Sequence, residues 1–129
     1  MKFVDLLGRE IKVNDIVANA TSCTSHGYLR RSIVKRVYNR TSYTWGYVGL
    51  EIKSLTIGDK WGWKDGKYQK IAKSVSTGNT GRGTTYDIKT QQLPEVVELD
   101  VIRLGTLEEA FTPEELQILK SSNTKLNYE

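Results

Sequence analysis

Short runs of alternating apolar and polar residues, separated by turn-forming residues, occupy most of this 129-residue chain. The clearest run spans residues 43–55, where Val48, Leu50 and Ile52 fall on one face of an extended strand. Three aromatic residues fall on the opposite face: Tyr43, Trp45 and Tyr47. We therefore expect one face of this strand to enter the core and the other to present rings.

Residues 56–76 contain the strongest hairpin signal, because Asp65-Gly66 suits a two-residue turn that needs positive φ at both central positions. The register that follows is given by three opposed pairs: Lys64 with Lys67, Trp63 with Tyr68, and Trp61 with Lys70. The rings of this segment have two interpretations that the sequence leaves open. They are core residues of a small β protein, or they form a stacking surface for nucleic-acid bases beside the lysines.

Residues 27–45 combine large aromatic residues with five basic residues and no acidic one. Leu29, Ile33 and Val37 recur every four residues, as in a helix that could enter a DNA groove. β-Branched residues and tyrosines favour a strand instead, and the segments on both sides read as strands. We predict a strand, interrupted by a bulge or a bend because its alternation is poor.

The C-terminal region predicts a helix that begins after Thr112. Thr112 is the expected N-cap, Pro113 the first helical residue, and Glu115 the partner that completes a capping box. Leu116 and Leu119 would pack on one end of a sheet. A short helical turn is expected over residues 107–111, and the chain is expected to fray from Ser121 onward.

Together these elements predict a mainly β, single-domain protein, a small antiparallel barrel of the SH3-like type with a short C-terminal helix. Residues 1–105 would form the barrel, with a first strand kinked at Asn14-Asp15. Residues 106–129 would form an acidic helical tail packed on the same domain.

Two segments resemble the entry of KOW-type SH3-like barrels. Residues 13–17 stand where that family has Val-Gly-Asp-x-Val, and residues 29–34 stand where it has a hairpin motif with glycine. Asn14 and Ser32 replace the two glycines, and Asn tolerates positive φ well. The chain is also similar in style to small basic early proteins of tailed bacteriophages. This resemblance implies DNA binding and an effect on host transcription or the nucleoid.

The formal net charge of +4 is unevenly distributed along the chain. Residues 27–89 hold thirteen basic and four acidic residues, whereas residues 94–129 hold three basic and eight acidic ones. Such a polarised chain attracts polyanions, nucleic acid above all. The alternative is a solvated basic face that pairs partly with the acidic tail.

Catalytic and metal-binding signals are weak. Cys23 and His26 are the only soft ligands and are too few for a zinc site, and no nucleophile, base and orienting group recur at a meaningful spacing. We expect no enzyme, no metal and no cofactor. Neither a secretory signal nor an apolar run long enough for a membrane span is seen, so the expected location is the cytoplasm, or the host cytoplasm or nucleoid for a viral protein.

The leading hypothesis is a nucleic-acid-binding protein with little sequence preference, with DNA preferred over RNA. The expected contact residues are Arg30, Arg31, Lys35, Arg36, Arg40, Trp45, Tyr47, Lys64, Lys67 and Arg82. Arg82 lies in a Gly-rich segment that is either an ordinary loop or a finger that orders on a phosphate. The alternative is a protein-interaction or counter-defence protein that binds a host factor or a small anionic nucleotide.

Overall fold

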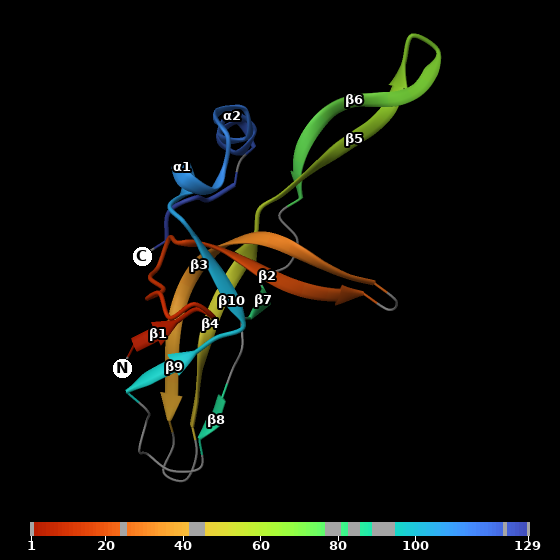
Figure 1. Cartoon of the computed structure of the whole chain (residues 1–129). Helices are drawn as coiled ribbons and strands as arrows, with labels where there is room; N and C mark the ends of the chain where they lie inside the picture. Colours follow the sequence, from red (N-terminus) through yellow and green to blue (C-terminus); the bar gives the residue numbers. More distant parts are fainter. Residues whose placement is uncertain are drawn as a thin grey trace.

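Strands account for most of the described chain, as the alternating pattern predicts. The computed structural model describes residues 2–23, 26–41, 46–76, 81–82, 86–88, 95–122 and 124–128. These residues form ten strands and two helices: β1 (Lys2–Val4), β2 (Ile16–Cys23), β3 (His26–Thr41), β4 (Gly46–Ser54), β5 (Thr56–Lys64), β6 (Lys67–Ser76), β7 (Gly81–Arg82), β8 (Tyr86–Ile88), β9 (Val96–Glu98), β10 (Val101–Gly105), α1 (Leu107–Ala110) and α2 (Pro113–Ser121). A mainly β fold with a short C-terminal helix is confirmed (Figure 1).

The largest sheet is antiparallel and has the strand order β10-β2-β3-β4-β7, with β8 also paired to β4. Its longest strand, β3, contains most of the basic stretch that begins at residue 27. This stretch is therefore a strand and not a recognition helix. The pairing of β3 with β4 shifts between Val34 and Arg36, which confirms the expected irregularity. No pairing between β10 and β7 closes the sheet within the described residues, so closure into a barrel stays a prediction.

Both faces of the sheet are buried where β2 and β3 pair. Ile16 and Ile33 belong to one apolar cluster, whereas Val17 and Val34, their neighbours in sequence, belong to another. All four side chains are fully buried. Since successive residues of a strand point to opposite faces, a strand covered on both sides has no clean apolar and polar alternation. This double burial explains the poor alternation of β3.

The first apolar cluster joins residues of β1, β2, β3, β4, β9 and β10. Val48, Leu50 and Ile52 of β4 are buried in it, as their spacing predicts. Val97 of β9, Val101 of β10 and Leu99 between these strands also belong to it, and Val101 N–H donates to the Leu99 carbonyl at 2.8 Å.

The N-terminal segment differs from the prediction. β1 pairs in parallel with β9, with Phe3 opposite Val97, a pairing between distant segments that the sequence did not indicate. The strand expected before Asn14 is not formed, since Glu10 makes only an isolated bridge with Val4 and regular pairing begins at Ile16. Asn14 has φ of 76°, a left-handed conformation that asparagine tolerates better than most residues.

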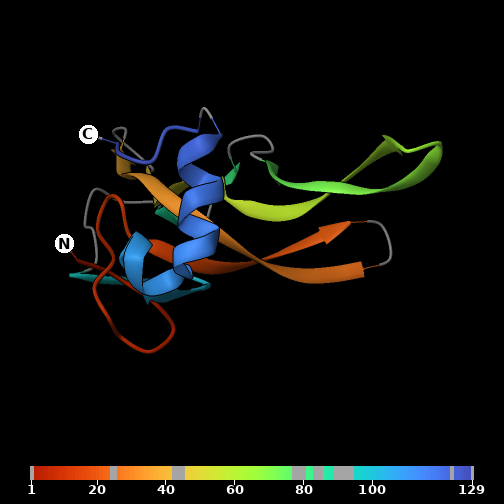
Figure 2. The ribbon, with the colours of Figure 1, turned by 90° about the horizontal axis from the view of Figure 1, so that it is seen from above.

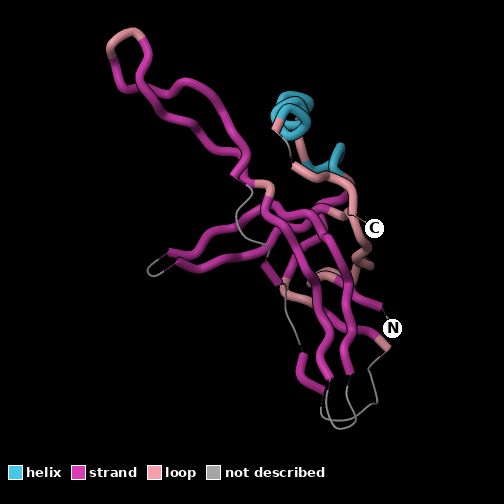
Figure 3. Tube along the Cα trace, turned by 180° about the vertical axis from the view of Figure 1, so that it is seen from behind, coloured by secondary structure: helices cyan, strands magenta, loops and turns pink. Residues whose placement is uncertain are grey.

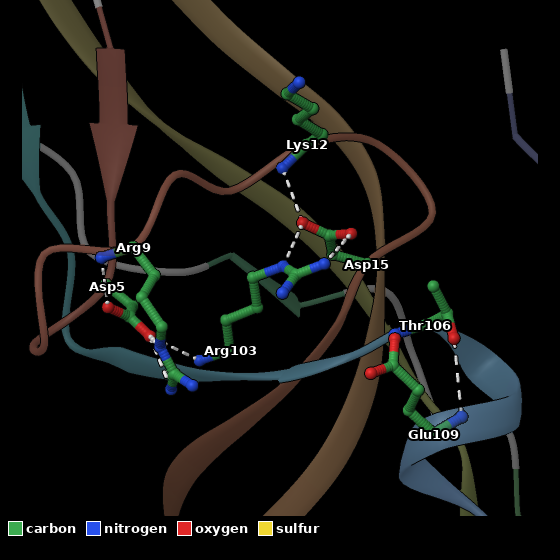
Figure 4. A network of polar contacts seen from close by, with 7 residues as sticks. All are labelled: Asp5, Arg9, Lys12, Asp15, Arg103, Thr106 and Glu109. Carbon is green, nitrogen blue, oxygen red and sulfur yellow. Dashed lines mark hydrogen bonds and ion pairs between the residues drawn. The ribbon is translucent and has the colours of Figure 1, made fainter.

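Asp5 is a fully buried carboxylate that holds the first loop against β10 (Figure 4). Its Oδ1 accepts from the N–H groups of Leu7 and Arg9, both at 2.9 Å. Its Oδ2 accepts from Arg103 N–H at 2.8 Å and from Arg9 Nε at 3.0 Å. Burial raises the pKa of Asp5, but these hydrogen bonds outweigh that effect and lower its pKa overall.

A second carboxylate, Asp15, holds the side chain of the same β10 residue (Figure 4). Arg103 Nε donates to Asp15 Oδ2 at 2.9 Å, and Lys12 N–H donates to the same oxygen at 2.8 Å. Arg103 is thus held by its backbone through Asp5 and by its side chain through Asp15. One residue of β10 is therefore joined to both ends of the segment between β1 and β2.

The two helices begin as predicted. Thr106 and Thr112 are N-caps, and each forms a full capping box with the glutamate three residues later. Leu119 of α2 is fully buried in the second apolar cluster, beside Phe111. No helix in the described part of the chain is long and apolar enough to cross a bilayer.

The chain after α2 packs on the body, so the expectation of fraying from Ser121 is wrong for residues 124–128. Tyr128 is buried in the second apolar cluster. Its N–H donates to Asn14 Oδ1 at 2.7 Å, and Asn14 Nδ2 donates to the Tyr128 carbonyl at 3.1 Å. This pair of hydrogen bonds joins the C-terminal segment to the turn before β2.

Replacing Asp5 by Asn should lower the free energy of unfolding by roughly 2–4 kcal/mol. The amide of Asn cannot accept all four hydrogen bonds of the Asp5 carboxylate, and the substitution also removes the negative charge that faces Arg9. Urea denaturation followed by far-UV circular dichroism measures this loss. Glu10→Gln is the matched control, since Glu10 is an exposed carboxylate of the same segment. Equal denaturation midpoints for the two variants would contradict this role of Asp5.

Candidate nucleic-acid interface

β5 and β6 form a separate two-stranded sheet, called the ribbon below. Its turn has Asp65 at φ 53° and Gly66 at φ 73°, so the predicted Asp-Gly turn is confirmed. The three predicted pairs are confirmed as well: Lys64 with Lys67, Trp63 with Tyr68, and Trp61 with Lys70. Figures 1 and 3 show the ribbon projecting well beyond the rest of the molecule.

The three rings of the ribbon lie on the surface. Trp61 is 55% exposed, Trp63 75% and Tyr68 62%, so the core interpretation of these residues is wrong. Tyr68 lies between the two tryptophans, with ring centroids 6.3 Å from Trp61 in a stacked arrangement and 5.7 Å from Trp63 in an edge arrangement. Trp61, Trp63 and Tyr68 share one face of the ribbon, because Trp61 and Trp63 are two residues apart and Tyr68 opposes Trp63. We call them the ring cluster.

Five exposed lysines lie along the ribbon: Lys60, Lys64, Lys67, Lys70 and Lys73. Lys70 lies opposite Trp61 and forms an ion pair with Asp59 at 3.0 Å. Lys64 and Lys67 oppose one another next to the turn, and no ion pair involves either of them among the described residues. Two like charges at this position destabilise a hairpin unless solvent or an anion separates them.

A bulge at Ile71 shapes the ribbon below the ring cluster. Lys60 pairs with Ala72 and Trp61 with Lys70, which leaves Ile71 as the extra residue of β6. A Cβ on Gly62 would lie 2.8 Å from Ile71 Cδ1, so glycine at this position gives the isoleucine room. Bulges of this kind increase the right-handed twist of a two-stranded sheet.

The root of the ribbon packs on the body. Ile57 of β5 and Val75 of β6 oppose one another and contact the second apolar cluster, which also holds Leu119 of α2. The backbone N–H of Leu55, between β4 and β5, donates to the Arg31 carbonyl at 2.9 Å. The ribbon is therefore held at its root by the same apolar cluster that holds the helix.

Arg31 was predicted to contact nucleic acid. In the structure its side chain makes intramolecular contacts instead. Its Nη2 lies 2.5 Å from Glu115 Oε2, and its Nη1 donates to Glu115 Oε1 at 3.1 Å and to the Ala110 carbonyl at 3.0 Å. The guanidinium also lies 4.2 Å from the centroid of the Phe111 ring. These contacts join β3 to both helices, so we leave Arg31 out of the candidate interface.

Two further basic residues of β3, Lys35 and Arg36, have side-chain partners within the protein. Arg36 Nε lies 3.0 Å from Glu51 Oε2 of β4, and Lys35 Nζ lies 5.4 Å from the Tyr128 ring centroid. Half of the Arg36 side chain remains exposed. Arg30 opposes Asn19 in the pairing of β2 with β3 and is partly buried. β3 thus offers a weaker positive surface than its sequence indicates.

The backbone positions of three further predicted residues are described. Arg40 opposes Tyr47 in the pairing of β3 with β4, and Arg82 of β7 opposes Glu51. Trp45 lies outside the described residues, as do residues 77–80 and 83–85 on either side of β7. The predicted roles of these residues stay predictions.

Two hairpins project from the same side of the molecule. Figure 2 shows the ribbon and the outer part of the β2–β3 hairpin projecting in the same direction, and Figure 3 shows that they diverge towards their tips. A crevice of about 190 Å³ lies at their roots and is lined by Ala18, Leu29, Arg30, Arg31, Thr56 and Ile57. Leu29 is 74% exposed there. The crevice therefore lies between β5 and the paired strands β2 and β3.

Metal chemistry finds no support at this interface. Within the residues that the structure describes, no three His, Cys, Asp or Glu side chains lie close enough together to hold a metal ion. Cys23 and His26 oppose one another at the outer end of the β2–β3 hairpin.

Sequence reasoning found the ribbon, and its alternative, that the basic face pairs partly with the acidic tail, is confirmed for Arg31 and Glu115. Glu115 was recognised only as the capping-box residue of α2, although its carboxylate also accepts from Arg31, 84 residues away. An excess of basic residues in β3 and of acidic residues in the helices was the only available signal for this pair. Comparison with protein-family models, with curated proteins and with solved structures returns no match.

The Arg31 and Glu115 pair should make the stability of the protein depend on pH. Arg31 and the Thr112 N–H lower the pKa of Glu115 from 4.5 to about 2. A carboxylate with a lowered pKa in the folded state stabilises the protein fully above its unfolded pKa, and this contribution is lost as the pH falls from about 4.5 towards 2. The expected loss is about 1–2 kcal/mol once solvent screening of this partly exposed pair is included.

Urea denaturation of the wild type and of Glu115→Gln between pH 7 and pH 2 measures this contribution. The variant should be less stable at pH 7, and the difference should shrink below pH 4.5. Glu114→Gln is the matched control, since Glu114 lies in the same helical turn and is exposed. A difference that stays constant down to pH 2 would contradict the assignment.

Proposed function

We propose that this protein binds nucleic acid, DNA in preference to RNA, with little sequence preference, through an interface centred on the ribbon. The observation that carries this proposal is the exposed ring cluster on a projecting hairpin that also holds five exposed lysines. Lysines neutralise phosphates and release counterions, and aromatic rings offer stacking surface to bases. The preference for DNA follows from the resemblance to phage DNA-binding proteins.

Charge and position favour the ribbon over β3 as the main contact surface. Arg31 and Arg36 form ion pairs with Glu115 and Glu51, which reduces the field of β3. Residues 56–76 hold five lysines and two aspartates, and only Lys70 among the lysines forms an ion pair within the described residues. The remaining positive charges of the ribbon are therefore available to phosphates.

The expected biological role is that of a small DNA-binding phage protein acting on host transcription or on the nucleoid, in the cytoplasm. A protein partner is the second candidate function. It is favoured by the same exposed rings, because aromatic residues are enriched at protein interfaces. A protein that is pulled down from lysate and stays bound after nuclease treatment would support the second candidate. Loss of the bound protein after nuclease treatment would support the first.

The Lys64→Gln/Lys67→Gln double variant should bind DNA more weakly and with a smaller dependence on salt. Each lysine that contacts a phosphate contributes roughly one unit to the slope of log affinity against log salt concentration. Fluorescence anisotropy of a labelled 20–30 base-pair duplex, titrated at several salt concentrations of about 50–200 mM, measures both quantities.

The matched control is Lys2→Gln/Lys120→Gln, which removes two exposed lysines from β1 and α2, away from the ribbon. This control should bind with nearly the wild-type slope. An affinity that does not change with salt in the wild type, or equal slopes in the two double variants, would argue against the proposed interface.

A further inference from the structure

The position of the ring cluster on the ribbon favours a surface on which bases stack over a wedge that enters between base pairs. Proteins that insert side chains between the base pairs of a duplex use apolar residues that protrude into the groove. The tip of this ribbon is Asp65-Gly66, a carboxylate and a glycine, and the negative charge opposes entry into the minor groove. Trp63 and Tyr68 lie behind the tip, on the broad side of the ribbon.

The ring cluster has more free surface than its structural role requires. Trp63 and Tyr68 form a cross-strand pair next to the turn, and such pairs stabilise hairpins. This contact covers only part of each ring, since Trp63 remains 75% exposed and Tyr68 62% exposed. Trp61 adds a third ring, stacked on Tyr68 and more than half exposed. The outward surfaces of the rings are left for a ligand.

Positive charge lies directly beside this apolar surface. Lys70 opposes Trp61 and is held there by Asp59, and Lys73 opposes Asp59 one step nearer the root of the ribbon. Lys64 and Lys67 pair one residue nearer the turn than Trp63 and Tyr68, and therefore belong to the opposite face of the ribbon. A ligand that fits both features has planar apolar groups at short intervals along a polyanionic chain.

We infer that the preferred ligand of the ribbon is single-stranded nucleic acid, whose bases stack on Trp61, Trp63 and Tyr68 while its phosphates contact the lysines. A duplex keeps its bases stacked on one another and offers the rings only backbone and groove edges, whereas a single strand offers the faces of its bases. This inference rests on the proposed function and narrows it to one structural class of nucleic acid.

The test compares a labelled oligothymidylate of about 12 nucleotides with a duplex of the same length, at one salt concentration. The wild type should bind the single strand more tightly, and binding should quench the fluorescence of its tryptophans. Trp63→Leu should weaken single-strand binding by roughly 5- to 100-fold and change duplex binding by less than about twofold.

Two further variants separate stacking from folding and from charge. Trp63→Tyr keeps a ring and should retain most single-strand affinity. Lys64→Gln/Lys67→Gln should weaken binding to both nucleic acids to a similar degree. Far-UV circular dichroism and a thermal melt check that Trp63→Leu keeps the folded body, as expected from the exposure of Trp63.

The outcomes distinguish the two proposals. Equal affinity for single strand and duplex, or an equal effect of Trp63→Leu on both, overturns the single-strand inference and leaves the proposed function standing. Absence of salt-dependent binding to either nucleic acid overturns both and favours a protein partner. Preferential, tryptophan-dependent binding of the single strand supports both.

Discussion

The contacts of the Arg31 guanidinium hold the upper half of the molecule together. From the middle of β3, this group pairs with Glu115 of α2, donates to the last carbonyl of α1 and covers the ring of Phe111. The second apolar cluster lies around these contacts, and the root of the ribbon packs into that cluster through Ile57 and Val75. The position of the ribbon therefore depends on a charge pair that makes no part of the candidate interface.

Local signals predicted the elements that local chemistry determines. The Asp65-Gly66 turn needs positive φ at two consecutive residues, so its sequence specifies both the hairpin and its register. The capping box of Thr112 and Glu115 specifies the start of α2 in the same way. For the candidate interface, the register placed rings and lysines together correctly, whereas the sequence left open whether the rings were buried.

Distant contacts were beyond the reach of the sequence. The parallel pairing of β1 with β9 joins the two ends of the β region, and Asp5 receives a hydrogen bond from Arg103, 98 residues away. No periodicity marks such pairs, because their partners meet only after the sheet has formed. The sequence of β3 was hard to interpret for a related reason. Ile33 and Val34 are buried on opposite faces, which removes the alternation, and Arg31 and Arg36 form intramolecular ion pairs.

The ribbon has a consequence for the behaviour of the protein in concentrated solution. Neither β5 nor β6 has another strand beside it among the described residues, so both long edges present unpaired backbone donors and acceptors. Lysines along such edges keep the ribbons of separate molecules apart by mutual repulsion. Were a polyanion to neutralise these lysines, as the proposed function requires, that repulsion would be lost and the edges would be free to pair. The lysines of the ribbon are thus both its positive charge and the protection of its edges.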